Sequence, residues 1–239
     1  MIRAVTFDYW NTLVYEERGH LRGKRAAAWA GILEGAGFAA EREALGAVFD
    51  ATWAVAAEHW VTNDHLSSEQ AAEIAVEKLG FDVPADIRAL LIEAFSDAGK
   101  DAELHLTDGL EECIALLKDR GVKIGIVCDV GFTPSRILRA FLEARGLLRN
   151  FDSWAFSDDV GVYKPARKIF EHALTPLGVA PEHAAHVGDL RRTDITGARA
   201  MGMTAVRYTG VWEDDSQLEP EGHFVISKHA ELPGVLGLA

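Results

Sequence analysis

The stretch that decides the fold is Ile2-Arg3-Ala4-Val5-Thr6-Phe7-Asp8-Tyr9-Trp10-Asn11-Thr12, a short apolar strand that ends in an aspartate and a turn. An aspartate at the carboxyl end of a parallel strand lies where open α/β sheets bind their ligands. A second short strand, Ala184-Ala185-His186-Val187, continues in the same way into Gly188-Asp189 and then Asp194. Carboxylates at two strand ends predict a pocket for a divalent metal ion.

Short apolar strands and helices alternate from about residue 104 onward. The pattern predicts strands at 2–7, 122–127, 153–156, 184–187, 204–207 and 224–226, with helices at 109–120, 134–145, 167–177 and 194–201. This alternation is typical of βαβ units and a parallel sheet. We therefore predict an α/β fold in which residues 1–15 and 101–239 form a Rossmann-like, doubly wound catalytic core.

Residues 16–100 show helical spacing without a convincing strand. Helices are predicted at 25–33, 41–59, 68–79 and 86–95, and Ser67 with Gln70 fits a capping box. A smaller all-helical domain inserted after the first strand would form a cap over the carboxyl edge of the sheet. Near its start lies a basic cluster, for which we favour a solvated helix face over a substrate-binding role: Arg18, His20, Arg22, Lys24 and Arg25.

The composition limits the class of partner. With 49% hydrophobic and 26% charged residues the chain is predicted to be globular, and its net charge of −13 argues against nucleic acid and anionic membranes. No apolar run approaches the roughly 18 residues that span a bilayer. Two cysteines and no secretory pattern at the N-terminus favour the cytoplasm. We expect a monomer or homodimer that acts on a small molecule.

Four groups of polar residues follow predicted strands and can converge on one sheet edge: Asp8 with Thr12, Cys128 with Asp129, Lys164, and Asp189 with Asp194. Their order resembles the haloacid dehalogenase superfamily with a helical C1-type cap. The motif that resembles the nucleophile loop spans residues 7–13, and the second motif spans 124–129. The lysine motif spans 160–165, and the metal motif runs from 186 to 194.

The resemblance implies a role for each of these residues. Asp8 is the expected nucleophile, and Mg²⁺ is the expected cofactor because it neutralises both the carboxylate and a phosphate. The expected metal site consists of Asp8, the backbone carbonyl of Trp10 and Asp189, with Asp194 supporting a ligand or a water. Lys164 would balance the charge of Asp8, and the expected substrate-binding residues are Thr12, Cys128, Asp129 and Lys164. Considered alone, Asp189 and Asp194 are also compatible with a helix cap and an early-turn acid.

Three positions depart from the family pattern. Trp10 stands where the family's phosphatases carry the aspartate that protonates the leaving oxygen, and indole is only a hydrogen-bond donor. Cys128 replaces a serine or threonine, so it is either a weak phosphate donor or a small buried strand residue. Asp129 is a candidate for the relocated acid and base, or else a turn residue.

These observations leave three functions open. The first is a Mg²⁺-dependent phosphohydrolase that forms an aspartyl-phosphate on Asp8, with weak or restricted activity because Trp10 cannot transfer protons. The second is a metal-independent 2-haloacid dehalogenase, which an aromatic residue at position 10 favours because halide leaves without a proton. The aspartates of the metal motif favour the first. The third is a non-catalytic relative that binds a phosphorylated ligand or a protein.

Overall fold

The computed structural model describes residues 1–217 and 220–238. The chain forms two compact units. The sheet unit comprises Met1–Tyr15, His105–Asp129 and Leu142–Ala239, and the helical unit comprises Glu16–Leu104 and Val130–Phe141. That residues 16–100 act as a cap over the sheet stays a prediction.

The sheet unit contains a parallel six-stranded sheet in the order β5-β4-β1-β6-β7-β8. The strands are β1 (Ala4–Phe7), β4 (Lys123–Cys128), β5 (Ser153–Phe156), β6 (Ala184–Gly188), β7 (Thr204–Tyr208) and β8 (Phe224–Ile226). Every residue of β1 is buried, as expected for a central strand covered on both faces. All six predicted strands are present within two residues of their predicted limits.

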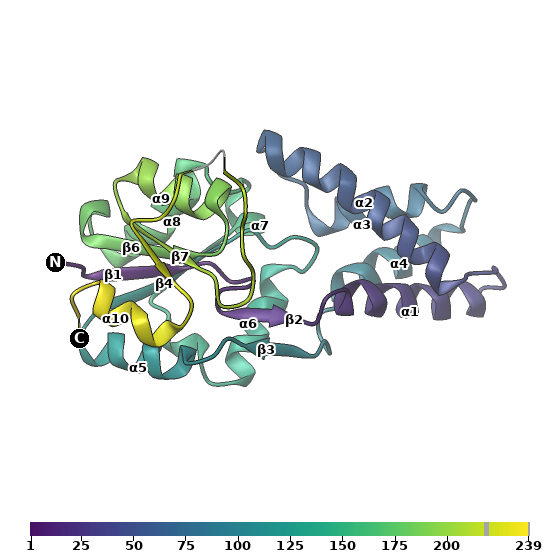
Figure 1. Ribbon diagram of the computed structural model, residues 1–239. Helices are drawn as coiled ribbons and strands as arrows, with labels where there is room; N and C mark the ends of the chain where they lie inside the picture. Colours follow the sequence, from purple (N-terminus) through teal and green to yellow (C-terminus); the bar gives the residue numbers. More distant parts are fainter. Residues whose placement is uncertain (218–219, 239) are drawn as a thin grey trace. The chain divides into compact units, whose positions relative to one another are not determined.

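Helices cover both faces of this sheet. In Figure 1, α8 (Arg167–Leu177) and α9 (Thr196–Met201) lie on one face, and α5 (Leu110–Asp119) and α10 (Leu232–Val235) lie on the other. Helix α8 buries Ile169, Phe170, Ala173, Leu174 and Leu177, an i, i+4, i+8 stripe that forms the core with the strands. The predicted doubly wound α/β fold is therefore confirmed.

Two local features differ from the predicted elements. The helix predicted from residue 194 begins with a π-helical turn at Arg191–Ile195, because the carbonyl of Leu190 accepts from the amides of both Asp194 and Ile195. Such turns are frequent at functional sites. Strands β2 (Val14–Glu16) and β3 (Leu104–Leu106) form a second sheet, and three residues each are too few for a periodic pattern.

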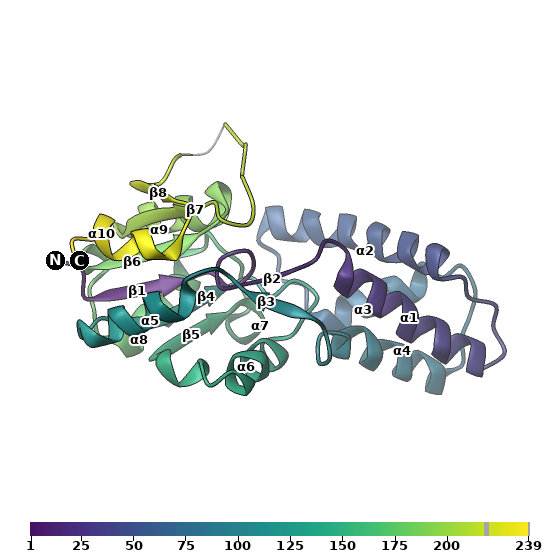
Figure 2. The ribbon, with the colours of Figure 1, turned by 60° about the horizontal axis from the view of Figure 1, so that its bottom comes forward.

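The helical unit is built on α1 (His20–Gly35), α2 (Arg42–Thr62), α3 (Ser68–Glu77) and α4 (Ala85–Asp97), with α6 (Ser135–Ala144) contributing its residues up to Phe141. Figure 2 shows α1 to α4 side by side. Their core surrounds Trp29, whose indole N–H donates to the carbonyl of Leu91 at 2.8 Å. The predicted capping box of Ser67 and Gln70 is present at the start of α3.

The basic cluster is predicted to form a solvated helix face, but one of its members, Arg25, is buried. Its guanidinium is buried, donates to the carbonyl of Phe95 and to Oγ1 of Thr133, and stacks on the rings of Phe95 and Phe132. Burial lowers the pKa of Arg25 to about 10. The reason is helical spacing, since Arg25 lies four residues from both Leu21 and Trp29 on the buried stripe of α1.

No helix in the described part of the chain is long and apolar enough to cross a membrane.

Candidate active site

The carboxyl end of β1 positions Asp8. Its amide donates to the carbonyl of Val187 at 2.8 Å, so the pairing of β1 with β6 continues one residue past the strand. The chain then turns tightly, with the amides of Leu13 and Val14 both donating to the carbonyl of Tyr9. The turn needs a left-handed residue at position 11, and asparagine tolerates that conformation (φ 56°). Asp8 is thus buried, in a loop that backbone hydrogen bonds hold in place.

Three carboxylates meet at this end of the sheet. Asp8, Asp189 and Asp194 each offer an oxygen, and these oxygens lie within 4.8 Å of one another. All three side chains are buried. Asp189 follows β6 and accepts at Oδ2 from the side-chain amide of Asn11 at 3.2 Å. The structure therefore brings together the aspartates of the two strand ends that the sequence singled out.

Lys164 lies within this cluster. Its ammonium donates to Oδ1 of Asp8 at 2.5 Å and to Oδ1 of Asp194 at 2.7 Å, and only 2% of the residue is exposed. Its backbone amide donates to Oδ1 of Asp129 at 3.0 Å. Asp129, at the end of β4, therefore holds the backbone of the lysine.

The charges of the cluster do not cancel. Burial raises the pKa of Asp8 well above its ordinary range despite Lys164, and Asp194 and Asp189 raise it further. Burial and Asp194 raise the pKa of Asp189 to about 7. Burial opposes the charge of Lys164, yet Asp194 and Asp8 outweigh it and raise the lysine pKa. Three ionised carboxylates and one ammonium would leave two negative charges, and this all-oxygen donor set fits a divalent cation such as Mg²⁺.

Three further predicted residues lie around this cluster. Thr12 is buried, and its hydroxyl oxygen has no hydrogen-bond partner among the described residues. Trp10 is half-buried and packs edge-on against Tyr9, with ring centroids 5.3 Å apart. Cys128 is fully buried, and burial with the charge of Asp8 raises its thiol pKa, so the thiol stays neutral. The roles predicted for these side chains, and for the Trp10 carbonyl, stay predictions.

Two buried histidines were not predicted to take part. His186 lies between Asp194 and Thr6, and burial lowers its pKa. His229 holds the nucleophile loop, since its Nε2 lies 2.9 Å from the carbonyl oxygen of Thr12, which also accepts from the hydroxyl of Thr107 at 2.7 Å. For His186 a signal existed, because a titratable ring within a fully apolar strand needs polar partners.

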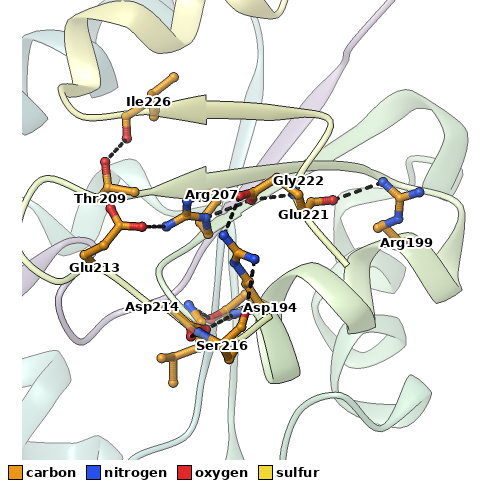
Figure 3. Close-up of polar contacts among 12 residues, drawn as sticks. Asp194, Arg199, Arg207, Thr209, Glu213, Asp214, Ser216, Glu221, Gly222 and Ile226 are labelled. Carbon is orange, nitrogen blue, oxygen red and sulfur yellow. Dashed lines mark hydrogen bonds and ion pairs between the residues drawn. The ribbon is translucent and has the colours of Figure 1, made fainter. Parts of the chain in front are cut away.

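The described part of the loop after β7, residues 209–217 and 220–223, is hydrogen-bonded to the residues that follow Asp189 (Figure 3). Glu221 accepts hydrogen bonds from Nε and Nη2 of Arg207 and from Nη2 of Arg191 at 2.8 to 3.0 Å. The backbone amide of Arg191 donates to Asp214 of the same loop at 2.7 Å. The loop that carries Asp189 is thereby held on both sides, by the sheet and by this cluster.

Comparisons with known proteins identify the family of the chain. The profile of the family described as haloacid dehalogenase-like hydrolase matches residues 2–202. The chain is 30% identical over 146 residues to haloacid dehalogenase-like hydrolase domain-containing protein 3 of Bos taurus, covering 60% of this chain and 57% of that protein. It is 31% identical to glyceraldehyde 3-phosphate phosphatase of Methanopyrus kandleri over 69% of this chain and 70% of the relative. It is 30% identical to ribulose-1,5-bisphosphate 5-phosphatase of Halopiger xanaduensis over 90% and 88%.

Solved structures share the fold. A HAD phosphatase from Thermococcus onnurineus superposes with a TM-score of 0.67 at 23% identity, covering 99% of this chain and 98% of that one. A 2-haloacid dehalogenase from Pseudomonas syringae superposes with a TM-score of 0.71, also at 23% identity, covering 99% of both chains. The fold is thus common to both chemistries, while the profile match and the aligned relatives establish that this chain belongs to the haloacid dehalogenase-like hydrolases.

Proposed function

We propose that the protein is a Mg²⁺-dependent phosphohydrolase that acts on a small phosphorylated metabolite through an aspartyl-phosphate on Asp8. The observation that carries the proposal is the cluster of three buried carboxylates with a single lysine among them. Asp8, Asp189 and the Trp10 carbonyl would hold the ion, with Asp194 supporting it. Bound there, Mg²⁺ would neutralise the phosphate and the attacking carboxylate.

The chain's own residues supply the remaining parts of the reaction. A carboxylate oxygen of Asp8 forms a bond to phosphorus while the ester bond breaks and its electron pair leaves with the alcohol oxygen. Lys164 neutralises Asp8 and binds a phosphate oxygen. The free hydroxyl of Thr12 is available to donate to the same phosphate. Water then hydrolyses the acyl-phosphate and restores Asp8.

The site differs from the family's phosphatases at position 10, the position that would protonate the leaving oxygen. Because Trp10 cannot protonate it, the enzyme should act on substrates whose leaving group needs little protonation, such as acyl and aryl phosphates. Asp129 is the candidate for a relocated acid and base. Its Oδ1 already accepts from the amide of Lys164, which also supports a purely positioning role.

The relatives support a small phosphorylated substrate. Two of them are named for phosphatase activity on glyceraldehyde 3-phosphate and ribulose 1,5-bisphosphate, both phosphorylated sugars. We extend that class to this chain. A cytoplasmic location and a monomeric or homodimeric state remain our predictions.

The second candidate function is a 2-haloacid dehalogenase, which Trp10 favours because expulsion of halide needs no acid. The buried aspartates of the metal motif favour phosphoryl chemistry instead, since dehalogenases of this family need no metal ion and usually lack the aspartate that corresponds to Asp189. A non-catalytic role in binding a phosphorylated ligand is the third.

One experiment separates these functions. Aryl, acyl and alkyl phosphates and 2-chloro acids are assayed with Mg²⁺ or with EDTA, beside Asp8→Asn as the matched control. We expect phosphate release that EDTA and Asp8→Asn both abolish. Chloride release in EDTA would replace the proposal by dehalogenation, and Mg²⁺ binding without any turnover would leave the non-catalytic role.

A further inference from the structure

Asp194 accepts hydrogen bonds on both carboxylate oxygens. Its Oδ1 accepts from Nζ of Lys164 at 2.7 Å and from Nε2 of His186 at 3.0 Å. Its Oδ2 accepts from the backbone amide of Leu190 at 3.1 Å and from the hydroxyl of Thr193 at 3.4 Å. The side chain is completely buried, and these four groups hold the carboxylate in place.

His186 uses both ring nitrogens. Nε2 faces Asp194, and Nδ1 lies 2.9 Å from the hydroxyl oxygen of Thr6 on the neighbouring strand. The ring of Phe170 packs edge-on against it, with centroids 5.1 Å apart. A neutral ring has one N–H, and the carboxylate of Asp194 can only accept, so Nε2 carries the proton. Nδ1 then accepts from the hydroxyl of Thr6, whose other contact, to the carbonyl oxygen of Ala185, is longer at 3.4 Å. This tautomer satisfies every polar atom of the side chain.

The parallel register explains how these groups meet. Thr6 pairs with His186 across β1 and β6, and side chains two residues further along each strand lie on the same face. Those next positions are Asp8 and Gly188. A Cβ atom at Gly188 would overlap the carboxyl group of Asp194, so that carboxyl group occupies the place where a side chain would lie. The carboxyl group of Asp194 thus lies level with Asp8, one side-chain position beyond His186 on the same face of the sheet.

We propose that His186 is a positioning residue for the reacting aspartate, acting through Asp194 and Lys164. Its Nε2–H fixes Oδ1 of Asp194, and that same oxygen fixes the ammonium of Lys164, which contacts Asp8. Asp194 selects this tautomer because its carboxylate can only accept, and Thr6 completes the chain by donating to Nδ1. The kinetic part of this inference rests on the proposed phosphohydrolase function.

A packing role alone would not require this arrangement. An apolar ring of similar size would fill the space beside Phe170, but it would leave Oδ1 of Asp194 with Lys164 as its one donor. The ammonium would then be freer to turn toward Asp189, one of whose ligand atoms lies within 4.8 Å of those of Asp8 and Asp194. The Nε2–H of His186 prevents this movement, because it is a second donor to Oδ1 of Asp194.

The test compares two substitutions of the histidine. His186→Phe keeps the ring and removes both nitrogens, whereas His186→Gln restores a donor toward Asp194. We expect His186→Phe to lower kcat by about ten- to hundredfold with KM changed less than about threefold, and His186→Gln to recover most of the loss. Leu174→Ala, in the same core but without a polar contact, controls for lost stability and should leave kcat unchanged.

A second readout does not depend on turnover. Calorimetric titration with Mg²⁺ alone should show about tenfold weaker binding in His186→Phe and recovery in His186→Gln. Nitrogen-15 NMR of the histidines should assign the wild-type ring of residue 186 to the Nε2–H tautomer. If His186→Phe does not fold, Thr6→Val replaces it, and it should leave Nδ1 without its donor, loosen the ring and reduce Mg²⁺ affinity.

The outcomes are distinct. An inactive wild type that nevertheless shows the expected titrations and tautomer would refute the phosphohydrolase function and support the positioning role. Equal Mg²⁺ affinities in the Phe and Gln variants, or an Nδ1–H tautomer, would overturn the positioning role even in an active enzyme. An equal loss of kcat in Leu174→Ala would reduce His186 to a packing residue.

Discussion

The ammonium nitrogen of Lys164 lies 2.5 Å from Oδ1 of Asp8, and both side chains are buried. Removing the ammonium of Lys164 leaves the buried carboxylates of Asp8 and Asp194 without their shared cation, and breaking a buried ion pair costs about 3 kcal/mol or more. We therefore expect Lys164→Met to be less stable than the wild type by about that much in EDTA. Added Mg²⁺ should raise the free energy of unfolding more in the variant than in the wild type. Urea denaturation with and without Mg²⁺ measures both effects, and an equal response to Mg²⁺ would argue against a shared metal and lysine site.

Trp10 determines the range of leaving groups in our proposal. Trp10→Asp should raise kcat for alkyl phosphates by up to about 10², the lower end of what general acid catalysis contributes, and change aryl phosphates little. Trp10→Asn is the matched control, because it relieves the same bulk without adding an acid. A similar gain in both variants would assign the effect to space rather than to proton transfer.

Asp129 has two possible roles that substitution separates. Asparagine keeps an oxygen that can accept from the amide of Lys164, so Asp129→Asn should retain activity on aryl phosphates, whereas Asp129→Ala should lose it. Steady-state kinetics on both substrate classes measures this. A selective loss on alkyl phosphates in Asp129→Asn would give Asp129 the proton-transfer role.

Much of the architecture follows from local patterns. The strand at 184–187 is recognisable because it is short, apolar and followed by Gly188-Asp189, and the capping box at Ser67 is equally local. The contact between Thr6 and His186 cannot be recognised from a local pattern, since the two residues are 180 positions apart. Likewise the π-helical turn at Arg191–Ile195 depends on a carbonyl shared by two amides, which no periodicity reveals.

Gly188 offers a test of close packing at the site. Because a Cβ there would overlap the Asp194 carboxyl group, Gly188→Ala should displace that group and lower both stability and Mg²⁺ affinity. Gly31→Ala is the matched control, since its Cβ meets nothing within 4 Å in the middle of α1, and there it should stabilise by about 0.5 to 1 kcal/mol. Denaturation and Mg²⁺ titration of both variants check this. A Gly188→Ala variant with unchanged stability and Mg²⁺ affinity would contradict the close contact between Gly188 and the carboxyl group of Asp194.

His229 should make the protein sensitive to acid. Burial lowers its pKa below the ordinary 6.5, and its Nδ1 has no partner among the described residues. Above pH 6.5 neither the folded nor the unfolded chain protonates it, so stability is unaffected. As the pH falls below 6.5 the unfolded chain binds a proton that the folded chain does not, and stability falls until the folded pKa is reached.

The comparison with His229→Gln isolates this contribution. Glutamine retains a donor for the Thr12 carbonyl but does not titrate, so between pH 6.5 and 5.5 the variant should lose less stability than the wild type, by up to about 1.4 kcal/mol per pH unit. Urea denaturation at a series of pH values measures the two slopes. Equal slopes would mean that His229 titrates normally in the folded chain.

The burial of Arg25 has a consequence for how the helical unit can be separated from the rest of the chain. Two of the groups that satisfy its guanidinium, Phe132 and Thr133, come from the segment Val130–Phe141, which follows the β4 strand in sequence. A fragment of residues 16–104 would lack these two residues and would expose the guanidinium of Arg25, which is buried in the complete chain. The insertion is therefore not a self-sufficient module that could be transplanted intact, and its exchange between relatives would have to carry a second piece of chain with it.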